Sequence, residues 1–276
     1  MTHRRAAKRV PTNLPLQVTS FIGRVHEKSE VTRRLASGRL LTLTGTGGAG
    51  KTRLALEVAS ELLEEFPDGV WLVELAPVLD DNLVAPTAAS VLGVVDQGED
   101  ALLRVLVDSL QERRLLLVLD NCEHLIAGVA RFVEALLRSC PQVRLLATSR
   151  EALGLSGETT WSVPSLSVPD PAEALTVTRV REYEAPQLFE ARALAVSPGF
   201  QITPSNVDAI AQLCRRLDGI PLAIELAAAW ASVLTPQELA ARLDDRFRLL
   251  RGGSRTALPR QQTLRATLDW SYDLSP

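Results

Sequence analysis

Short apolar runs alternate with stretches of helical periodicity over most of the first 165 residues. The runs at 40–44, 70–75, 115–119 and 143–148 are β-prone, and a fifth strand is expected at about 160–163. The run at 115–119 is apolar without interruption, which is typical of a central parallel strand buried on both faces. Helical spacing between the runs predicts right-handed crossovers, so the pattern favours an α/β fold built on a parallel sheet.

The pattern changes after Pro164, where proline and mixed polar residues predict a linker before a helical region. The helices expected beyond it cover about 185–196, 204–217, 221–234 and 236–243. Thr235 precedes Pro236 and is followed by Glu238, which is the spacing of a capping box at a helix start.

One stretch, residues 45–52 (Gly-Thr-Gly-Gly-Ala-Gly-Lys-Thr), matches the phosphate-binding pattern G-x-x-x-x-G-K-[ST] at every fixed position. Glycines allow positive φ, so consecutive N–H groups can face phosphate oxygens, and the following helix N-terminus adds partial positive charge. Lys51 is expected to reach the β- and γ-phosphates, and the Thr52 hydroxyl is expected to ligate Mg²⁺. The predicted nucleotide-binding residues of this stretch and its continuation are Gly45, Gly47, Gly48, Ala49, Gly50, Lys51, Thr52 and Arg53.

Asp120 ends the apolar run at 115–119 and predicts a second element of a nucleotide site. A carboxylate at the end of a strand can hold Mg²⁺ opposite Thr52. Many ATPases place a second acid directly after this Asp to activate water, whereas this chain has Asn121, an amide that cannot act as a base. Glu123 lies two residues further along, a displacement that does not fix where its carboxylate points. The pattern therefore predicts either slow hydrolysis or a catalytic base elsewhere in the chain.

Arg150 follows the strand expected at 143–148. Nucleotide sites in open parallel sheets lie beyond the carboxyl ends of the strands. A guanidinium there could bond the γ-phosphate, and its position equally allows an ion pair with Glu151 or another acid. The predicted catalytic residues are Lys51, Asp120 and Arg150, and the predicted Mg²⁺ ligands are Thr52 and Asp120.

Composition argues against several other classes of protein. The 276 residues are 46% hydrophobic and 23% charged with a net charge of −3, so no global field favours nucleic acid or an anionic membrane. Three unpatterned cysteines, Cys122, Cys140 and Cys214, argue for a reducing cytoplasm without a disulfide framework. No apolar run is long enough to span a bilayer. The basic N-terminus lacks the apolar core of a signal peptide and is expected to be a flexible tail.

Five segments carry a family resemblance in their order and residues: 21–24, 45–52, 116–124, 147–151 and 217–227. Together they resemble the nucleotide-binding region of the STAND ATPases of the NB-ARC class, above all the bacterial branch in SARP-type and LuxR-type transcriptional regulators. The similarity covers roughly residues 16–276. It implies a P-loop domain with sheet order 5-1-4-3-2, followed by a small helical domain.

The resemblance also implies residue roles. Pro221, in the Gly-x-Pro segment, is expected to approach the adenine from the helical domain, while Ile22 and Arg24 line the adenine side. Arg150, in the Thr-Ser-Arg segment, is expected to sense the γ-phosphate. Residues 260–272 resemble the opening of a winged-helix domain that this chain would leave incomplete, so no DNA-binding domain is expected within it.

The expected organisation has five parts: a flexible basic tail at 1–18, a P-loop nucleotide-binding domain at 19–165, a linker at 166–183, a helical domain at 184–252 and the start of a winged helix at 253–276. The leading hypothesis is a cytoplasmic switch that binds ATP or ADP with Mg²⁺, hydrolyses ATP slowly, and could self-associate on ATP binding. A P-loop kinase or metabolic ATPase and a passive nucleotide-binding scaffold are the alternatives. The Gly219-Ile220-Pro221 segment within a helical region favours the switch.

Overall fold

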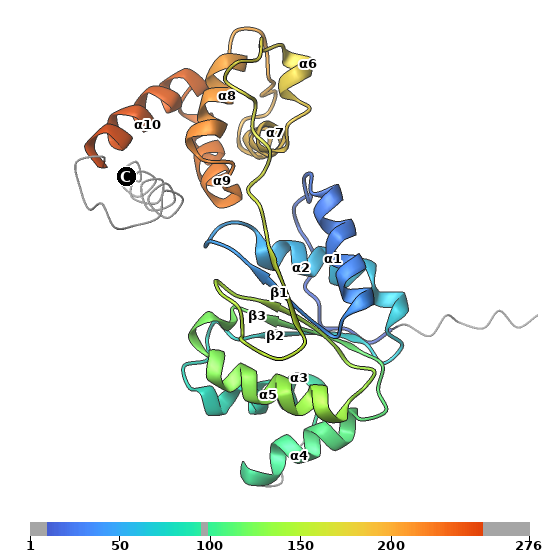
Figure 1. The fold of residues 1–276 in the computed structure, drawn as a ribbon. Coiled ribbons are helices and arrows are strands. Elements are labelled where there is room, and N and C mark those ends of the chain that lie inside the picture. The colour runs from blue at the N-terminus through green and yellow to red at the C-terminus, as the bar shows by residue number, and fades with distance from the viewer. Residues whose placement is uncertain (1–9, 95–98, 251–276) are drawn as a thin grey trace, which may run out of the picture. The chain divides into compact units, whose positions relative to one another are not determined.

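In the computed structural model, five parallel strands form one sheet in the order β2-β3-β4-β1-β5 (Figure 1). This is the predicted order 5-1-4-3-2, counted from the opposite edge, and the prediction is confirmed. The strands are β1 (Leu40–Thr44), β2 (Val70–Glu74), β3 (Leu116–Asp120), β4 (Arg144–Thr148) and β5 (Glu158–Ser162).

The structure describes residues 10–94 and 99–250, and these divide into two units. Among the described residues, the first unit takes 10–19, 26–45 and 51–162. The second unit takes 20–25, 46–50 and 163–250. The predicted winged-helix start at 253–276 lies outside the described residues.

The sheet of the first unit is covered by helices on both faces, α1 and α2 on one and α3, α4 and α5 on the other (Figure 1). The helices are α1 (Val25–Ser37), α2 (Lys51–Glu61), α3 (Val84–Leu92), α4 (Glu99–Leu110) and α5 (Ile126–Ser139), with 3₁₀ turns η1 (Leu63–Glu65), η2 (Asp81–Leu83) and η3 (Cys122–His124). The apolar run of β3 is buried along its length, as a two-sided central strand requires.

The strand register brings Asp120 and Thr148 together at one edge of the sheet, the edge formed by the carboxyl ends of the strands. Leu119 lies opposite Ala147 in the β3–β4 pair, and Leu43 lies opposite Thr148 in the β1–β4 pair. The ends of β1, β3 and β4 therefore reach the same edge, where Asp120 and Thr148 become neighbours.

The outer edge of β2 is covered by residues within the expected tail of 1–18. Thr12 forms an isolated parallel bridge with Val70. The Asn13 side chain donates to the Leu72 carbonyl at 2.8 Å and accepts from the Leu72 amide at 2.7 Å. This side-chain amide takes the place of a neighbouring strand's backbone, so part of the edge is paired.

The second unit is helical, and its first helix lies inside the linker predicted at 166–183. Its helices are α6 (Val177–Val180), α7 (Glu184–Val196), α8 (Val207–Arg216), α9 (Pro221–Ala229) and α10 (Pro236–Leu250), with a 3₁₀ turn η4 (Trp230–Ser232). The capping box of α10 is confirmed, because Thr235 N donates to Glu238 Oε2 at 2.8 Å and Glu238 N donates to Thr235 Oγ1 at 3.3 Å. In contrast, α8 begins at Val207 rather than at 204, because residues 204–206 form a turn.

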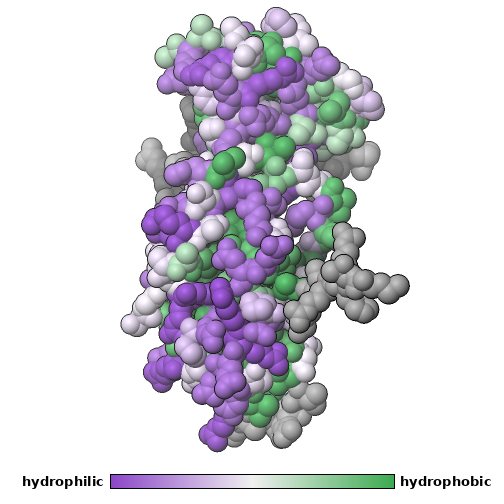
Figure 2. All heavy atoms as spheres, turned by 90° about the vertical axis from the view of Figure 1, so that its right-hand side faces the viewer, coloured by the Kyte–Doolittle hydropathy of each residue, from purple (hydrophilic) through white to green (hydrophobic). Residues whose placement is uncertain are grey.

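Several large exposed apolar side chains of the described residues lie mostly in segments that connect helices and strands. They include Leu16, Val18, Leu79, Leu83 and Val233. On the face drawn in Figure 2, hydrophilic and apolar side chains are interspersed. Among the described residues, no helix has both the length and the apolar character needed to cross a membrane.

A tight turn sets the start of α9. Asp218 and Gly219 both have positive φ, at 51° and 63°, and Pro221 follows at the first helical position. The Gly219 carbonyl accepts from the Leu166 amide at 2.9 Å. A Cβ on Gly219 would lie 2.2 Å from the Leu166 carbonyl oxygen, so only glycine fits this approach.

We expect Gly219→Ala to lower the free energy of unfolding by about 1–3 kcal/mol, because the added methyl strains both φ and the contact with the Leu166 backbone. Urea unfolding followed by circular dichroism measures the loss. Gly38→Ala is the matched control, because its Cβ would meet atoms no closer than 3.5 Å, and it should shift stability by less than about 0.5 kcal/mol. Equal losses in the two variants would contradict the steric explanation.

Candidate functional site

The loop between β1 and α2 has the backbone that its glycines predict. Gly45, Gly48 and Gly50 have φ values of 144°, 75° and 84°, which residues other than glycine rarely adopt. The Ala49 amide donates to the Thr46 carbonyl at 3.3 Å, closing a turn inside the loop. The loop then leads directly into the first turn of α2, where N–H groups without helical partners can face an anion.

Lys51 is the first residue of α2 and its side chain is largely buried, with 9% of the residue exposed. Its ammonium donates to the Gly45 carbonyl at 2.9 Å across the loop. Burial lowers the pKa of Lys51, and the charges of Glu123 and Asp120 act in the opposite direction. The ammonium therefore lies within the electrostatic reach of the acids that follow β3.

The Asp120 carboxylate joins α2 to two strands. Its Oδ1 accepts from the Thr52 hydroxyl and from the Thr148 hydroxyl, each at 2.6 Å. Thr148 is fully buried, and its hydroxyl also accepts from the backbone amide of Asn121 at 3.0 Å. The two predicted Mg²⁺ ligands, Thr52 and Asp120, are thus in direct contact, and their hydroxyl and carboxylate oxygens are the donors that Mg²⁺ prefers.

Arg150 lies two residues beyond β4. It forms an ion pair with an acid, which is one of the two possibilities that its position in the sequence allowed. The partner is Glu123 and not the adjacent Glu151, with Arg150 Nε donating to Glu123 Oε1 at 2.9 Å. The Arg150 side chain is 69% exposed and that of Glu123 only 16%. A guanidinium with this exposure can still reach an added ligand.

Asn121 has a left-handed backbone, with φ of 66°. Asparagine tolerates this conformation better than most residues. Its Nδ2 lies 3.5 Å from His124 Nδ1, and the other ring nitrogen of His124 is 2.8 Å from the Val78 carbonyl oxygen. The residue directly after Asp120 is therefore an amide in a constrained turn.

Arg24 supports the loop from within the second unit. It is 3% exposed, and its guanidinium donates to the Ala49 carbonyl at 2.7 Å and to the Pro164 carbonyl at 3.1 Å. Its own amide donates to Glu184 Oε1 at 2.5 Å. These bonds give Arg24 a defined contact with the loop, while a contact with adenine stays a prediction.

Pro221 also meets the loop inside the second unit. The Leu222 amide donates to the Gly48 carbonyl at 3.2 Å. The Pro221 ring lies 3.6 Å from the position that a Cβ on Gly50 would take. Pro221 is therefore placed beside the phosphate-binding loop.

Ile22 and Arg53 have protein contacts in this structure. Ile22 packs against the apolar core of the second unit. Arg53 donates to the carbonyl and hydroxyl of Thr19 at 2.8 and 2.6 Å. Their predicted contacts with nucleotide stay predictions.

Two residues of the quoted segments, Thr148 and Glu123, were given no role in the predicted site. Thr148 positions Asp120, and the sequence shows it as a polar residue that ends a strand otherwise apolar at its centre. Glu123 pairs with Arg150, and its direction depends on the turn that follows β3.

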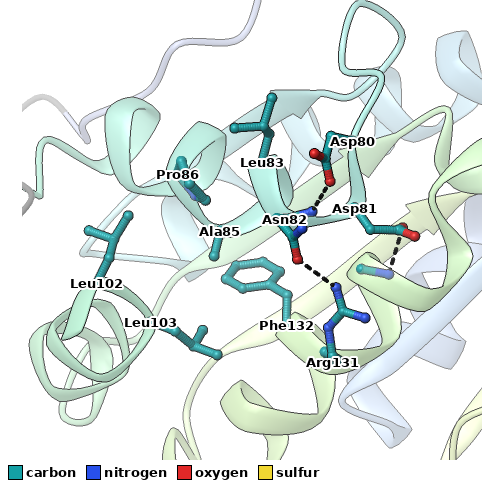
Figure 3. Close-up of a pocket in the computed structure, with 11 residues that line it drawn as sticks. Asp80, Asp81, Asn82, Leu83, Ala85, Pro86, Leu102, Leu103, Arg131 and Phe132 are labelled. Atoms are coloured by element: carbon teal, nitrogen blue, oxygen red, sulfur yellow. Dashed lines mark hydrogen bonds between the residues drawn. The ribbon is translucent and has the colours of Figure 1, made fainter. Parts of the chain in front are cut away.

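A separate cavity of about 640 Å³ lies between η2, α3, α4 and α5 (Figure 3). Its polar side chains bond to other groups that line it: Asp80 accepts from the Asn82 backbone amide at 2.9 Å, and Asp81 accepts from the Gly128 backbone amide at 2.8 Å. Arg131 donates to the Asn82 side chain at 3.4 Å. None of the predicted site residues lines this cavity, so it is distinct from the edge that carries Asp120.

Residues 33–155 match a family model described as an AAA domain. A Mycobacterium tuberculosis protein named "Putative HTH-type transcriptional regulator Rv0890c" is 50% identical over 240 residues, which are 87% of this chain and 26% of that protein. "Regulatory protein AfsR" of Streptomyces griseus is 31% identical over 260 residues, covering 87% of this chain and 24% of that protein. The chain thus spans about a quarter of the length of these two relatives.

A solved structure shares the fold at low sequence identity. It is a STAND protein with a tetratricopeptide repeat sensor, PH0952, from Pyrococcus horikoshii, with a TM-score of 0.53 and 15% identity over 94% of this chain and 41% of that chain. At this identity the similarity concerns the fold. The match at 33–155, the sheet order and the loop geometry agree on a P-loop NTPase-like fold, followed by a helical region.

Proposed function

We propose that this chain is the nucleotide-binding switch of a transcriptional regulator, a STAND module of the NB-ARC class as found in SARP-type and LuxR-type proteins. It binds ATP or ADP with Mg²⁺ at the loop of residues 45–52 and works in the cytoplasm. The observation that carries the proposal is the contact of Thr52 with Asp120 at 2.6 Å, beside a loop whose glycines have positive φ. The AAA match and the names of the regulator relatives support it.

Each part of the site has a separate task in this proposal. Backbone N–H groups of the loop and the first turn of α2 receive phosphate oxygens, and the buried Lys51 adds a positive charge. Thr52 and Asp120 would hold Mg²⁺, which neutralises phosphate charge when bound. Arg150 is exposed enough to reach a γ-phosphate, which distinguishes ATP from ADP.

The residues after β3 favour a site that retains a bound nucleotide over one that hydrolyses it rapidly. Asn121 supplies no base, and its backbone is held by the bond to Thr148. A switch needs a nucleotide state that lasts, so slow hydrolysis is consistent with this role. Self-association in the ATP state remains part of the proposal. A metabolic ATPase or kinase would instead require an efficient base or an acceptor site.

We expect Lys51→Ala to remove most affinity for ATP and ADP while the fold is kept. A charged hydrogen bond contributes about 1.5–3 kcal/mol, so the dissociation constants should rise at least tenfold. Isothermal titration calorimetry with Mg²⁺ measures the change, and circular dichroism verifies the fold. Lys28→Ala is the matched control, because Lys28 pairs with Glu61 on the surface of the first unit. Unchanged nucleotide binding in Lys51→Ala would count decisively against the site.

Thr148→Val should weaken both folding and Mg²⁺-dependent nucleotide binding, because Asp120 loses one of two hydroxyl donors and the Asn121 amide loses its acceptor. The free energy of unfolding should fall by about 1–3 kcal/mol. Thr148→Ser keeps the hydroxyl and should retain most of the Mg²⁺ dependence. Urea unfolding and nucleotide titration with and without Mg²⁺ test this. Identical Mg²⁺ dependence in both variants would show that the hydroxyl does not position Asp120.

We expect the chain to hydrolyse ATP at well below about 1 s⁻¹, under the usual range of enzymes. Asn121→Asp should raise the rate if this side chain faces the attacking water, and Asn82→Asp, in the separate cavity, should not. Steady-state phosphate release measures both. A wild-type rate of tens per second would exclude the switch as proposed and favour a metabolic enzyme.

A further inference from the structure

Glu123 lies beside Arg150 where β3 and β4 end, although the sequence motifs assign it no role toward phosphate. Its Oε1 accepts from Arg150 Nε at 2.9 Å. Its charge also acts on Lys51, where it opposes the effect of burial on the pKa more strongly than Asp120 does. Glu123 therefore contacts one of the cations that the proposed function assigns to phosphate, Arg150, and acts electrostatically on the other, Lys51.

The position of Glu123 is set by the packed turn η3. Cys122, on one side, is fully buried and its thiol donates to the Leu119 carbonyl at 3.4 Å. His124, on the other side, bonds to the Val78 carbonyl at 2.8 Å. Because both neighbouring side chains are hydrogen-bonded to the backbone, the position of Glu123 in the turn is fixed. Glu123 therefore differs from an acid on a mobile surface segment.

We propose that Glu123 sets the preference of the site for diphosphate over triphosphate, by acting as an internal anion that holds Arg150 when no γ-phosphate is bound. A carboxylate and a phosphate oxygen compete for the same guanidinium donors. ATP must draw Arg150 away from Glu123 or bind beside its negative charge, whereas ADP carries no γ-phosphate and avoids both costs. This inference rests on the proposed function, because it requires nucleotide at the loop.

Glu151 offers a matched comparison. It follows Arg150 directly in the chain and is exposed, so it carries the same charge near the same guanidinium. The ion pair nevertheless forms with Glu123. A simple long-range charge effect would make the two acids equivalent, whereas an internal anion requires Glu123 alone.

The test is a set of ATP and ADP dissociation constants, measured by calorimetry with Mg²⁺ on the full chain. Glu123→Gln should raise the ratio of ATP affinity to ADP affinity by about two- to fivefold, the scale of a partly exposed charge pair. Glu151→Gln should leave the ratio of the two affinities unchanged. In an Arg150→Ala background, Glu123→Gln should no longer favour ATP, because the guanidinium for which the two anions compete is gone.

An unchanged or reduced preference for ATP in Glu123→Gln would overturn the inference, and so would an equal gain in Glu151→Gln. A gain that persists without Arg150 would also overturn it. Failure of the proposed function gives a different result, because Lys51→Ala would then bind both nucleotides as the wild type does. Circular dichroism of Glu123→Gln verifies that the substitution, which keeps the side-chain shape, leaves the fold intact.

Discussion

The two hydroxyl donations to one oxygen of Asp120 are the contact on which the site depends. Thr52 comes from the first turn of α2 and Thr148 from the last residue of β4, so this carboxylate fixes a helix and two strands at one point. The contact is possible because parallel strands bring their carboxyl ends to the same edge of a sheet. It also presents a hydroxyl and a carboxylate together, as a hard cation requires.

Two hydrogen bonds hold the backbone of the glycine-rich loop at Gly48 and Ala49. Arg24 binds the Ala49 carbonyl and the Leu222 amide binds the Gly48 carbonyl. Since the C=O and N–H of one trans peptide point in opposite directions, the bond from Arg24 also fixes the direction of the Gly50 amide. Glycine at positive φ permits this backbone, and the surrounding donors select it from the many conformations that glycine allows.

Charge balance explains how a largely buried lysine is tolerated at this edge. Burial alone disfavours the Lys51 ammonium, while Glu123 and Asp120 favour it. Arg150 adds a further positive charge and is itself paired with Glu123. This part of the sheet thus combines two cations, Lys51 and Arg150, with two carboxylates, Glu123 and Asp120.

The sequence by itself determined the parallel sheet, its strand order by resemblance, the glycine-rich loop between a strand and a helix, and the place of Asp120 at the end of a buried strand. These features follow from local signals: apolar runs of strand length, glycines at fixed spacing and an acid directly after a buried strand. Only the tertiary structure decided that Thr148 supports Asp120, that Arg150 pairs with Glu123 rather than Glu151, and that Asn13 covers part of the β2 edge. Each of these contacts joins residues distant in sequence or depends on the direction of a turn. Hydrophobic periodicity carries no information on either, because it reports which face of an element is buried and not which polar groups meet there.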